Sequence, residues 1–150
     1  MRSLPLACWP PADREAWQEA CRPHVRLRCG GAAAGMKPVT QADLASRYGY
    51  FLDHLNRCGV LDLAAPASAH VTPGAVESFL AEVRSIWRSV TQAQSTYKLR
   101  RMAEILAPER DFSWLREIEK DLALVACPRD RFDRIDRGAG RGWARSDQGG

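Results

Sequence analysis

The feature that most constrains this chain is a set of apolar stripes at helical spacing. In residues 40–58 the large apolar side chains recur at intervals of three and four, which places them on one face of a helix. They are Leu44, Tyr48, Phe51, Leu52 and Leu55. Similar stripes occur in residues 73–87, 90–106 and 113–125. No segment alternates apolar and polar residues over the length of a strand, so the pattern predicts an all-α fold with four core helices.

Residues that start and stop helices flank these stripes. Thr40 is expected to cap the first core helix, and Gly59 supplies a left-handed stop after it. Thr72 followed by Pro73 repeats the starting pattern, with a capping hydroxyl and then a residue that needs no hydrogen-bond partner for its nitrogen. The third core helix is expected to end before Pro108.

Composition divides the chain into three parts. Residues 1–37 are expected to form an N-terminal arm, with a short extra helix after Pro10 and Pro11 and a flexible linker rich in Gly and Ala. Residues 38–128 form the helical domain, and residues 129–150 form an Arg- and Gly-rich tail expected to be disordered.

Several classes of function are disfavoured by what the sequence lacks. Five cysteines, an odd number without a C-x2-C pair, and three scattered histidines indicate neither a disulfide framework nor a metal site, and no cofactor is expected. No apolar run approaches the ~20 residues that span a bilayer, and the N-terminus lacks the apolar core of a secretory signal. We therefore expect a cytoplasmic protein without membrane contacts.

Motifs for catalysis are also missing. The sequence has no G-x-S-x-G, no Gly-rich phosphate loop and no H-E-x-x-H. Glu117 and Glu119 are two residues apart on a helix, so their carboxylates diverge. We expect no enzymatic activity and no small-molecule substrate.

The basic residues favour a nucleic-acid partner. The net charge is +4, and 19 of the 22 basic residues are Arg, whose planar group suits bidentate contact with phosphate and guanine. The helix over residues 90–106 carries most of the candidates on the face that its apolar stripe leaves outward. The candidate DNA-binding residues are Arg47, Arg88, Gln92, Gln94, Tyr97, Lys98, Arg100 and Arg101. An ordinary solvent-exposed face would carry the same residue types, so that alternative stays open.

The order of these segments resembles a known family. TQADLASRYGYFLDHL, HVTPGAVESFLAEV, SVTQAQSTYKLRRMAEIL and DFSWLREIEKDLALVACPR are similar, in order and spacing, to the N-terminal core-binding domain of tyrosine recombinases, the phage-integrase family. The resemblance covers about residues 38–130. It implies a SAM-like four-helix bundle that forms one jaw of a clamp on double-stranded DNA, beside other recombinase protomers. Site-specific recombination and DNA integration are the processes it implies.

The same resemblance implies a division of labour. In that family the nucleophilic tyrosine belongs to a catalytic domain that follows the core-binding domain, and this chain ends where that domain would begin. We therefore expect a truncated form, a frameshifted remnant or a stand-alone accessory protein that binds DNA, with steep salt dependence, and does not cleave it. The alternative is a helical protein–protein interaction module without DNA binding, in which Trp87 and Trp114 anchor a partner.

Overall fold

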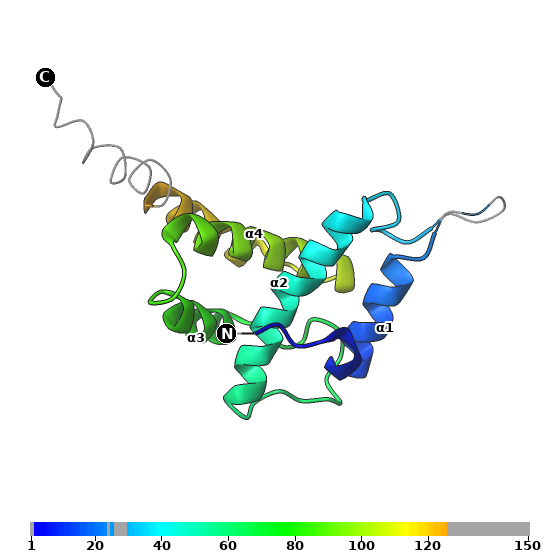
Figure 1. Cartoon of the computed structure of the whole chain (residues 1–150), viewed down its shortest axis with the longest axis horizontal. Helices are drawn as coiled ribbons and strands as arrows, with labels where there is room; N and C mark the ends of the chain where they lie inside the picture. The colour runs from blue at the N-terminus through cyan, green and yellow to red at the C-terminus, as the bar shows by residue number, and fades with distance from the viewer. Residues whose placement is uncertain (1, 24, 26–29, 126–150) are drawn as a thin grey trace, which may run out of the picture.

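The computed structural model describes residues 2–23, 25 and 30–125, and this part of the chain is all-helical, as the sequence predicts. Its elements are η1 (Leu6–Cys8), α1 (Pro11–Ala20), α2 (Pro38–Arg57), α3 (Pro73–Val83), α4 (Ser89–Leu106) and a last helix over residues 113–125. Within the described residues there is no β-strand. Helix α4 crosses α2, and the last helix runs back along α4 (Figure 1).

The apolar stripe of α2 forms the centre of the core. All five residues expected on it are buried, and Tyr48, Phe51 and Leu52 have no exposed surface. Among α1, α2, α3 and α4, the most extensive contact is between α2 and α4, and α3 packs on the C-terminal half of α2. There the Phe51 and Phe79 rings meet edge to face, with centroids 5.6 Å apart. The stripe therefore does what its spacing predicts, because each turn of α2 places one large side chain between its neighbours.

Three of the expected helix ends are confirmed and one is wrong. Helix α4 ends at Leu106, before Pro108. The Thr72 hydroxyl accepts a hydrogen bond from the Ala75 amide at 3.2 Å, and Gly59 has a φ of +76°. Helix α2, however, begins at Pro38 rather than after a Thr40 cap. Pro38 has the φ that a first helical residue needs, so the helix starts three residues earlier than a Thr40 cap would place it, and the Thr40 amide donates to the Lys37 carbonyl at 2.9 Å.

Helix α3 is shorter than its stripe predicts. It ends at Val83, and the amides of Ile86 and Trp87 both donate to the Val83 carbonyl in a turn toward α4. Ile86 is consequently 54% exposed. Trp87 still packs on the core through edge-to-face contacts with Tyr50 and Phe79. The apolar spacing continues beyond the end of α3 because the turn that follows still places Trp87 against the core, although Ile86 is exposed.

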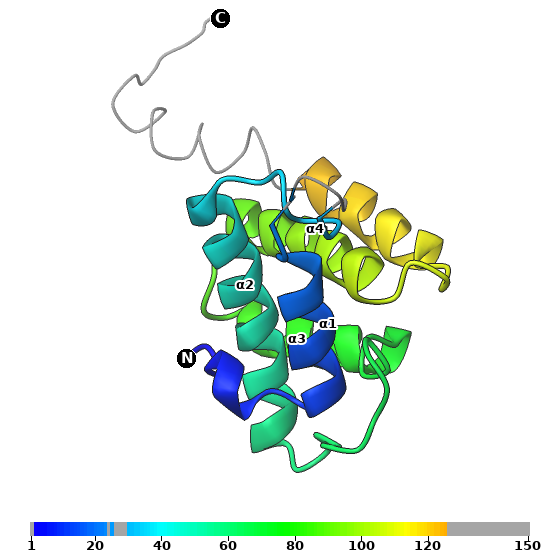
Figure 2. The ribbon, with the colours of Figure 1, turned by 90° about the vertical axis from the view of Figure 1, so that its right-hand side faces the viewer.

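The N-terminal segment is part of the core, in contrast to the separate arm that the sequence predicts. Trp9, Trp17 and Ala33 are at most 5% exposed. Helix α1 lies beside α2 (Figure 2). After α1 the Ala33 amide donates to the Ala20 carbonyl at 2.8 Å, and a Cβ at Gly31 would lie 2.2 Å from the Glu19 carbonyl oxygen. The small residues expected to give flexibility therefore allow a close backbone approach. Residues 26–29 and the tail 129–150 lie outside the described residues.

A buried carboxyl fixes α1 to the middle of the chain. Asp13 is fully buried, and its Oδ1 accepts a hydrogen bond from the Ser68 amide at 2.7 Å. Burial raises the pKa of Asp13, against the smaller lowering effects of the Ser68 amide and His70. Oδ2 of Asp13 and the Tyr48 hydroxyl have no hydrogen-bond partner among the described residues. Asp13 lies in the first turn of α1, and its hydrogen bond to Ser68 makes it an internal contact between distant segments.

Replacing Trp17 with Ala tests whether the N-terminal segment belongs to the core. Because the indole is 5% exposed, we expect W17A to lower the free energy of unfolding by about 3–5 kcal/mol. Urea unfolding followed by circular dichroism measures it. Q18A, at an exposed position of the same helix, should change the value by at most about 0.5 kcal/mol. A W17A protein as stable as Q18A would contradict the packing described.

The pH dependence of D13N tests the buried carboxyl. The pKa of Asp13 in the folded protein lies above its ordinary value of 3.8. The protonated carboxyl therefore contributes to the stability of the fold below pH 3.8, and this contribution is lost as pH rises through the raised pKa. We therefore expect the stability of D13N relative to wild type to increase with pH across that interval, because the amide can accept from Ser68 without burying a charge. Urea unfolding at a series of pH values measures the difference.

Asp111 provides a control of opposite sign. Its pKa is lowered by hydrogen bonds from Ser113, so its contribution is present above pH 3.8 and is lost as pH falls through the lowered pKa. D111N should therefore lose stability relative to wild type as pH rises. If the difference in free energy of unfolding between D13N and wild type did not vary with pH, the Asp13 carboxyl would be ionised as readily in the folded chain as in the unfolded one.

Candidate nucleic-acid interface

Helix α4 lies between α2 and the last helix, and it exposes a single narrow ridge. Leu99, Met102, Ala103 and Leu106 are buried, as the sequence predicts. The opposite face carries Gln94, Tyr97 and Arg101, which are three and four residues apart and so follow one another along the helix. We call these three residues the α4 ridge.

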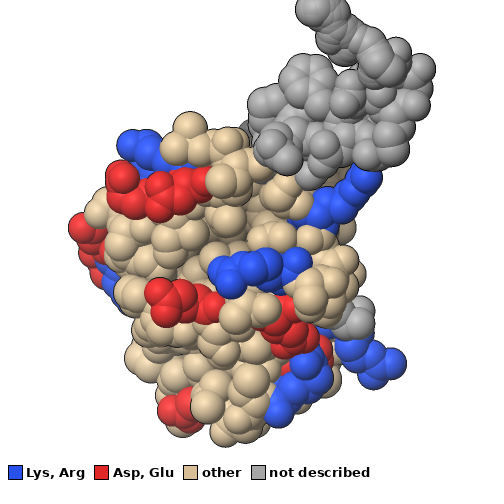
Figure 3. Space-filling model, turned by 90° about the vertical axis from the view of Figure 1, so that its left-hand side faces the viewer, with Lys and Arg blue, Asp and Glu red and all other residues tan. Residues whose placement is uncertain are grey.

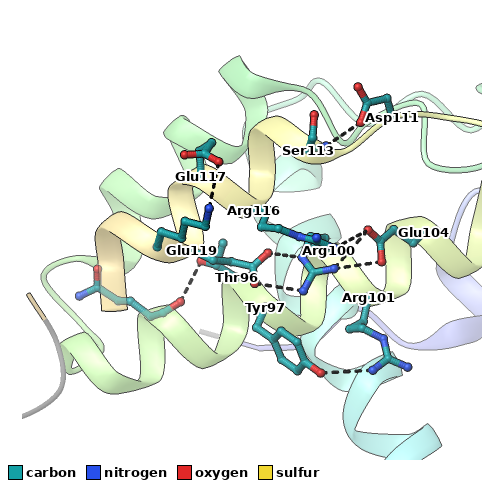
Figure 4. Close-up of polar contacts among 12 residues, drawn as sticks. Thr96, Tyr97, Arg100, Arg101, Glu104, Asp111, Ser113, Arg116, Glu117 and Glu119 are labelled. Atoms are coloured by element: carbon teal, nitrogen blue, oxygen red, sulfur yellow. Dashed lines mark hydrogen bonds and ion pairs between the residues drawn. The ribbon is translucent and has the colours of Figure 1, made fainter. Parts of the chain in front are cut away.

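The α4 ridge is polar and lacks acidic partners. Gln94 is exposed, and Tyr97 is 41% exposed. The Arg101 guanidinium donates to the Tyr97 hydroxyl at 3.2 Å (Figure 4). Among the described residues, no carboxylate lies within ion-pair distance of Arg101. The ridge therefore presents one amide, one phenol and one uncompensated cation to its surroundings.

Gln92 and Arg100, two of the expected DNA-binding residues, are buried instead. Gln92 is 7% exposed, and its side-chain amide donates to the Trp87 carbonyl at 3.0 Å. It lies seven residues before Leu99, almost two helical turns, and so shares the buried face. Arg100 is 8% exposed and binds the carboxylates of Glu104 and Glu119 (Figure 4). The outward position expected for Arg100 is wrong because the last helix covers the flank of α4 that carries it.

Lys98 and Arg47 are engaged on the other flank of α4. Both form ion pairs with Asp43 of α2, and Arg47 also donates to the Ser95 hydroxyl at 2.6 Å. Burial acts to raise the pKa of Asp43, but the hydrogen bonds and charges of Lys98 and Arg47 lower it below its ordinary value. The carboxylate therefore remains ionised at neutral pH, and the two cations hold α2 against α4.

Arg88 and Arg84 are available at the start of α4. Arg88 is exposed and precedes the first residue of the helix, where its backbone forms the N-cap. Arg84 is exposed directly after α3, and neither guanidinium has an acidic partner in the part of the chain that the structure describes. Arg88 is among the residues that the sequence predicts to bind DNA, and Arg84 is not, because the predicted helix extends through residue 87 and gives Arg84 no special position.

A shallow groove separates α4 from the last helix. Its volume is about 360 Å³, and it is lined by Ala93, Gln94, Tyr97, Arg116, Glu119, Lys120 and Ala123. Two alanines form part of the groove wall, where no long side chain fills the space. Sequence reasoning could not find the groove because it depends on how two helices far apart in the chain are paired.

Charge on the described part of the chain is balanced. Of the 22 basic and 18 acidic residues, 8 basic and 4 acidic residues lie outside it, which leaves 14 of each. Acidic and basic side chains alternate over the face shown in Figure 3. The net charge of +4 therefore belongs to residues 26–29 and 126–150, and the helices offer local cations rather than a strongly positive field.

Comparison with known protein families, with curated protein sequences and with solved structures finds no match to this chain. Among the described residues, no three His, Cys, Asp or Glu side chains are grouped as a metal site. No described helix is both long enough and apolar enough to cross a membrane.

A pair of adjacent arginines tests which cations of α4 are structural. R100Q should lower the free energy of unfolding by about 3 kcal/mol, because it leaves the largely buried Glu119 carboxylate without its partner. R101Q removes the same charge from the ridge and should change stability by at most about 0.5 kcal/mol. Urea unfolding of both variants measures this. An equal loss of stability in R100Q and R101Q would contradict the assignment of Arg100 to a buried ion pair and of Arg101 to the outward ridge.

Proposed function

We propose that this chain binds double-stranded DNA through the α4 ridge, in the manner of the core-binding domain of a tyrosine recombinase. The observation that carries the proposal is the division of the cations on α4. Lys98 and Arg100 are ion-paired at its flanks, and Arg101 stands on the outward ridge without a carboxylate partner among the described residues. A cation left uncompensated between two neutralised ones is suited to an anionic ligand.

The ridge has the chemistry and the dimensions for a major groove. A helix is about 10–12 Å across with its side chains, and the major groove of B-DNA is about 12 Å wide. Gln94 can pair with an adenine edge and Arg101 with a guanine edge. Arg84 and Arg88, at the start of α4, are suited to phosphates and would set the register of the helix on the duplex.

The helical architecture is compatible with the proposed family. The four core helices follow one another in the expected order, and the helix proposed to read DNA is the third. We assign this bundle to the SAM-like, core-binding type and expect it to act beside other recombinase protomers on a recombination site. In this proposal the chain holds the duplex and a separate catalytic domain performs strand cleavage.

The ion pairs revise the expected salt dependence. With Arg47, Lys98 and Arg100 bound to carboxylates, three exposed or half-exposed arginines remain near α4, namely Arg84, Arg88 and Arg101. Each phosphate contact contributes about −0.9 to the slope of log K against log salt. Contacts from these three arginines should therefore give a slope no steeper than about −3. This is shallower than the composition alone suggests.

R101Q tests the proposed interface. We expect it to weaken binding to a short duplex about 10-fold or more, since one good base contact is worth about 1–3 kcal/mol. Fluorescence anisotropy at low ionic strength measures the affinity. R2Q removes an equal charge from the N-terminal segment, which is attached to α2 through the Ser3 hydroxyl, and should bind as wild type does. Equal binding by R101Q and wild type would contradict the assignment of the ridge.

The groove beside α4 favours a second candidate function, a helical protein-interaction module. Ala93 and Ala123 leave space there that an apolar side chain of a partner protein would fill. A123E would block such a partner, whereas R101Q, at a ridge residue outside the groove lining, should leave partner binding unchanged. If the folded protein ignored duplex DNA at very low salt, this second function would replace the first.

A further inference from the structure

A cluster of polar side chains joins α2 to α3, away from the α4 ridge. His54 of α2 is 4% exposed, and its ring nitrogens contact two residues of α3. Nδ1 binds the Glu82 carboxylate, and Nε2 lies 2.8 Å from the hydroxyl oxygen of Ser78. Ser78 itself is exposed. A hydroxyl, an imidazole and a carboxylate are thus connected in series, with the hydroxyl at the surface.

The carboxylate is fixed by a second pair of charges. Oε2 of Glu82 accepts from Arg57 at 2.8 Å, and Arg57 in turn binds the buried Asp53. Burial acts to raise the pKa of Glu82, but hydrogen bonds and charges from Arg57 and His54 lower it. Glu82 therefore remains ionised at neutral pH, and its position does not depend on His54 alone.

An ionised Glu82 determines the tautomer of His54. A carboxylate only accepts hydrogen bonds, so Nδ1 of a neutral His54 must carry the proton that it shares with Glu82. Nε2 is then an acceptor, and the Ser78 hydroxyl donates to it. This is the order in which a nucleophilic serine, a general base and an orienting carboxylate act in acyl transfer.

We propose that Ser78 is an activated nucleophile that accepts an acyl group from small esters with a good leaving group. The proposal rests on the contacts of Ser78, His54 and Glu82 and is independent of DNA binding. The three residues are absent from any motif in the sequence because they come from two helices, 24 and 28 residues apart in the chain.

The chemical step is a transfer from the ester to the serine. Oγ of Ser78 attacks the carbonyl carbon, and its proton passes to Nε2 of His54. The bond from the carbonyl carbon to the leaving-group oxygen breaks, and that oxygen takes the proton from Nε2. The products are acyl-Ser78 and an alcohol or phenol, with His54 neutral again. Glu82 stabilises the imidazolium that forms between the two proton transfers.

Cys58 is the competing nucleophile in this cluster. Its sulfur lies 3.7 Å from the same Nε2, and the thiol is exposed. A neutral imidazole has one acceptor nitrogen, so Ser78 and Cys58 cannot both donate to it fully. The test therefore uses C58A, in which Ser78 alone remains beside His54.

The experiment is acetylation of the full chain by 4-nitrophenyl acetate, followed by intact mass and peptide mapping. In C58A we expect one acetyl group on Ser78, formed about 100-fold faster than on Ser85, because a general base contributes about 10²–10⁴-fold. Ser85 is the matched control: it is exposed in the turn after α3, and its hydroxyl donates only to the Glu82 carbonyl, at 3.3 Å. Adding S78A to C58A should remove the adduct.

Two further variants separate a nucleophilic role from a structural one. In C58A, H54Q should slow acetylation of Ser78 about 100-fold or more. E82Q preserves the shape of the side chain but can donate to Nδ1, which moves the proton to Nε2 and should slow the reaction similarly. Circular dichroism verifies that both variants are folded. Acetylation of Ser78 at the rate of Ser85, or an unchanged rate in folded H54Q or E82Q, would overturn the proposal and leave the cluster as a contact between α2 and α3.

Discussion

Ion pairs on both flanks of α4 hold the helices of this chain in their arrangement. On one side Lys98 and Arg47 share Asp43 of α2, and on the other Arg100 binds Glu104 and Glu119. The Lys98–Asp43 and Arg100–Glu119 pairs join segments that are distant in sequence, so the apolar core alone does not set the rotation of α4 about its axis. With both flanks engaged, the α4 ridge is the face of the helix that stays in contact with solvent.

This arrangement changes how the basic composition relates to function. Arginine-rich sequences suggest a broad positive surface, yet the described residues, loops included, carry as many acidic as basic side chains. Most of the cations expected to contact DNA instead neutralise carboxylates inside the fold. A small number of uncompensated arginines next to Gln94 and Tyr97 is better suited to positioning and limited base readout than to strong non-specific attraction.

Local sequence signals predicted the helices well because the physics behind them is local. The stripe that includes Tyr48 and the Thr72–Pro73 start depend on residues within a few turns of one another, and both are confirmed. Burial of Arg100 depends on which helix covers α4, and the sequence does not specify that, whereas burial of Gln92 follows from its position on the same face as Leu99. Asp13 and the His54 cluster escaped prediction for the same reason, since their partners lie in other segments.

The most direct measurement of the central claim is a titration of the ¹⁵N-labelled protein with a short duplex, followed by amide chemical shifts. We expect the largest changes at the amides of the α4 ridge and at Arg88, with those of α3 around Ser78 unchanged. Changes confined to the groove-facing side of residues 113–125, or an absence of changes in α4 while the duplex binds, would contradict the claim that the outward face of α4 is the DNA-binding surface.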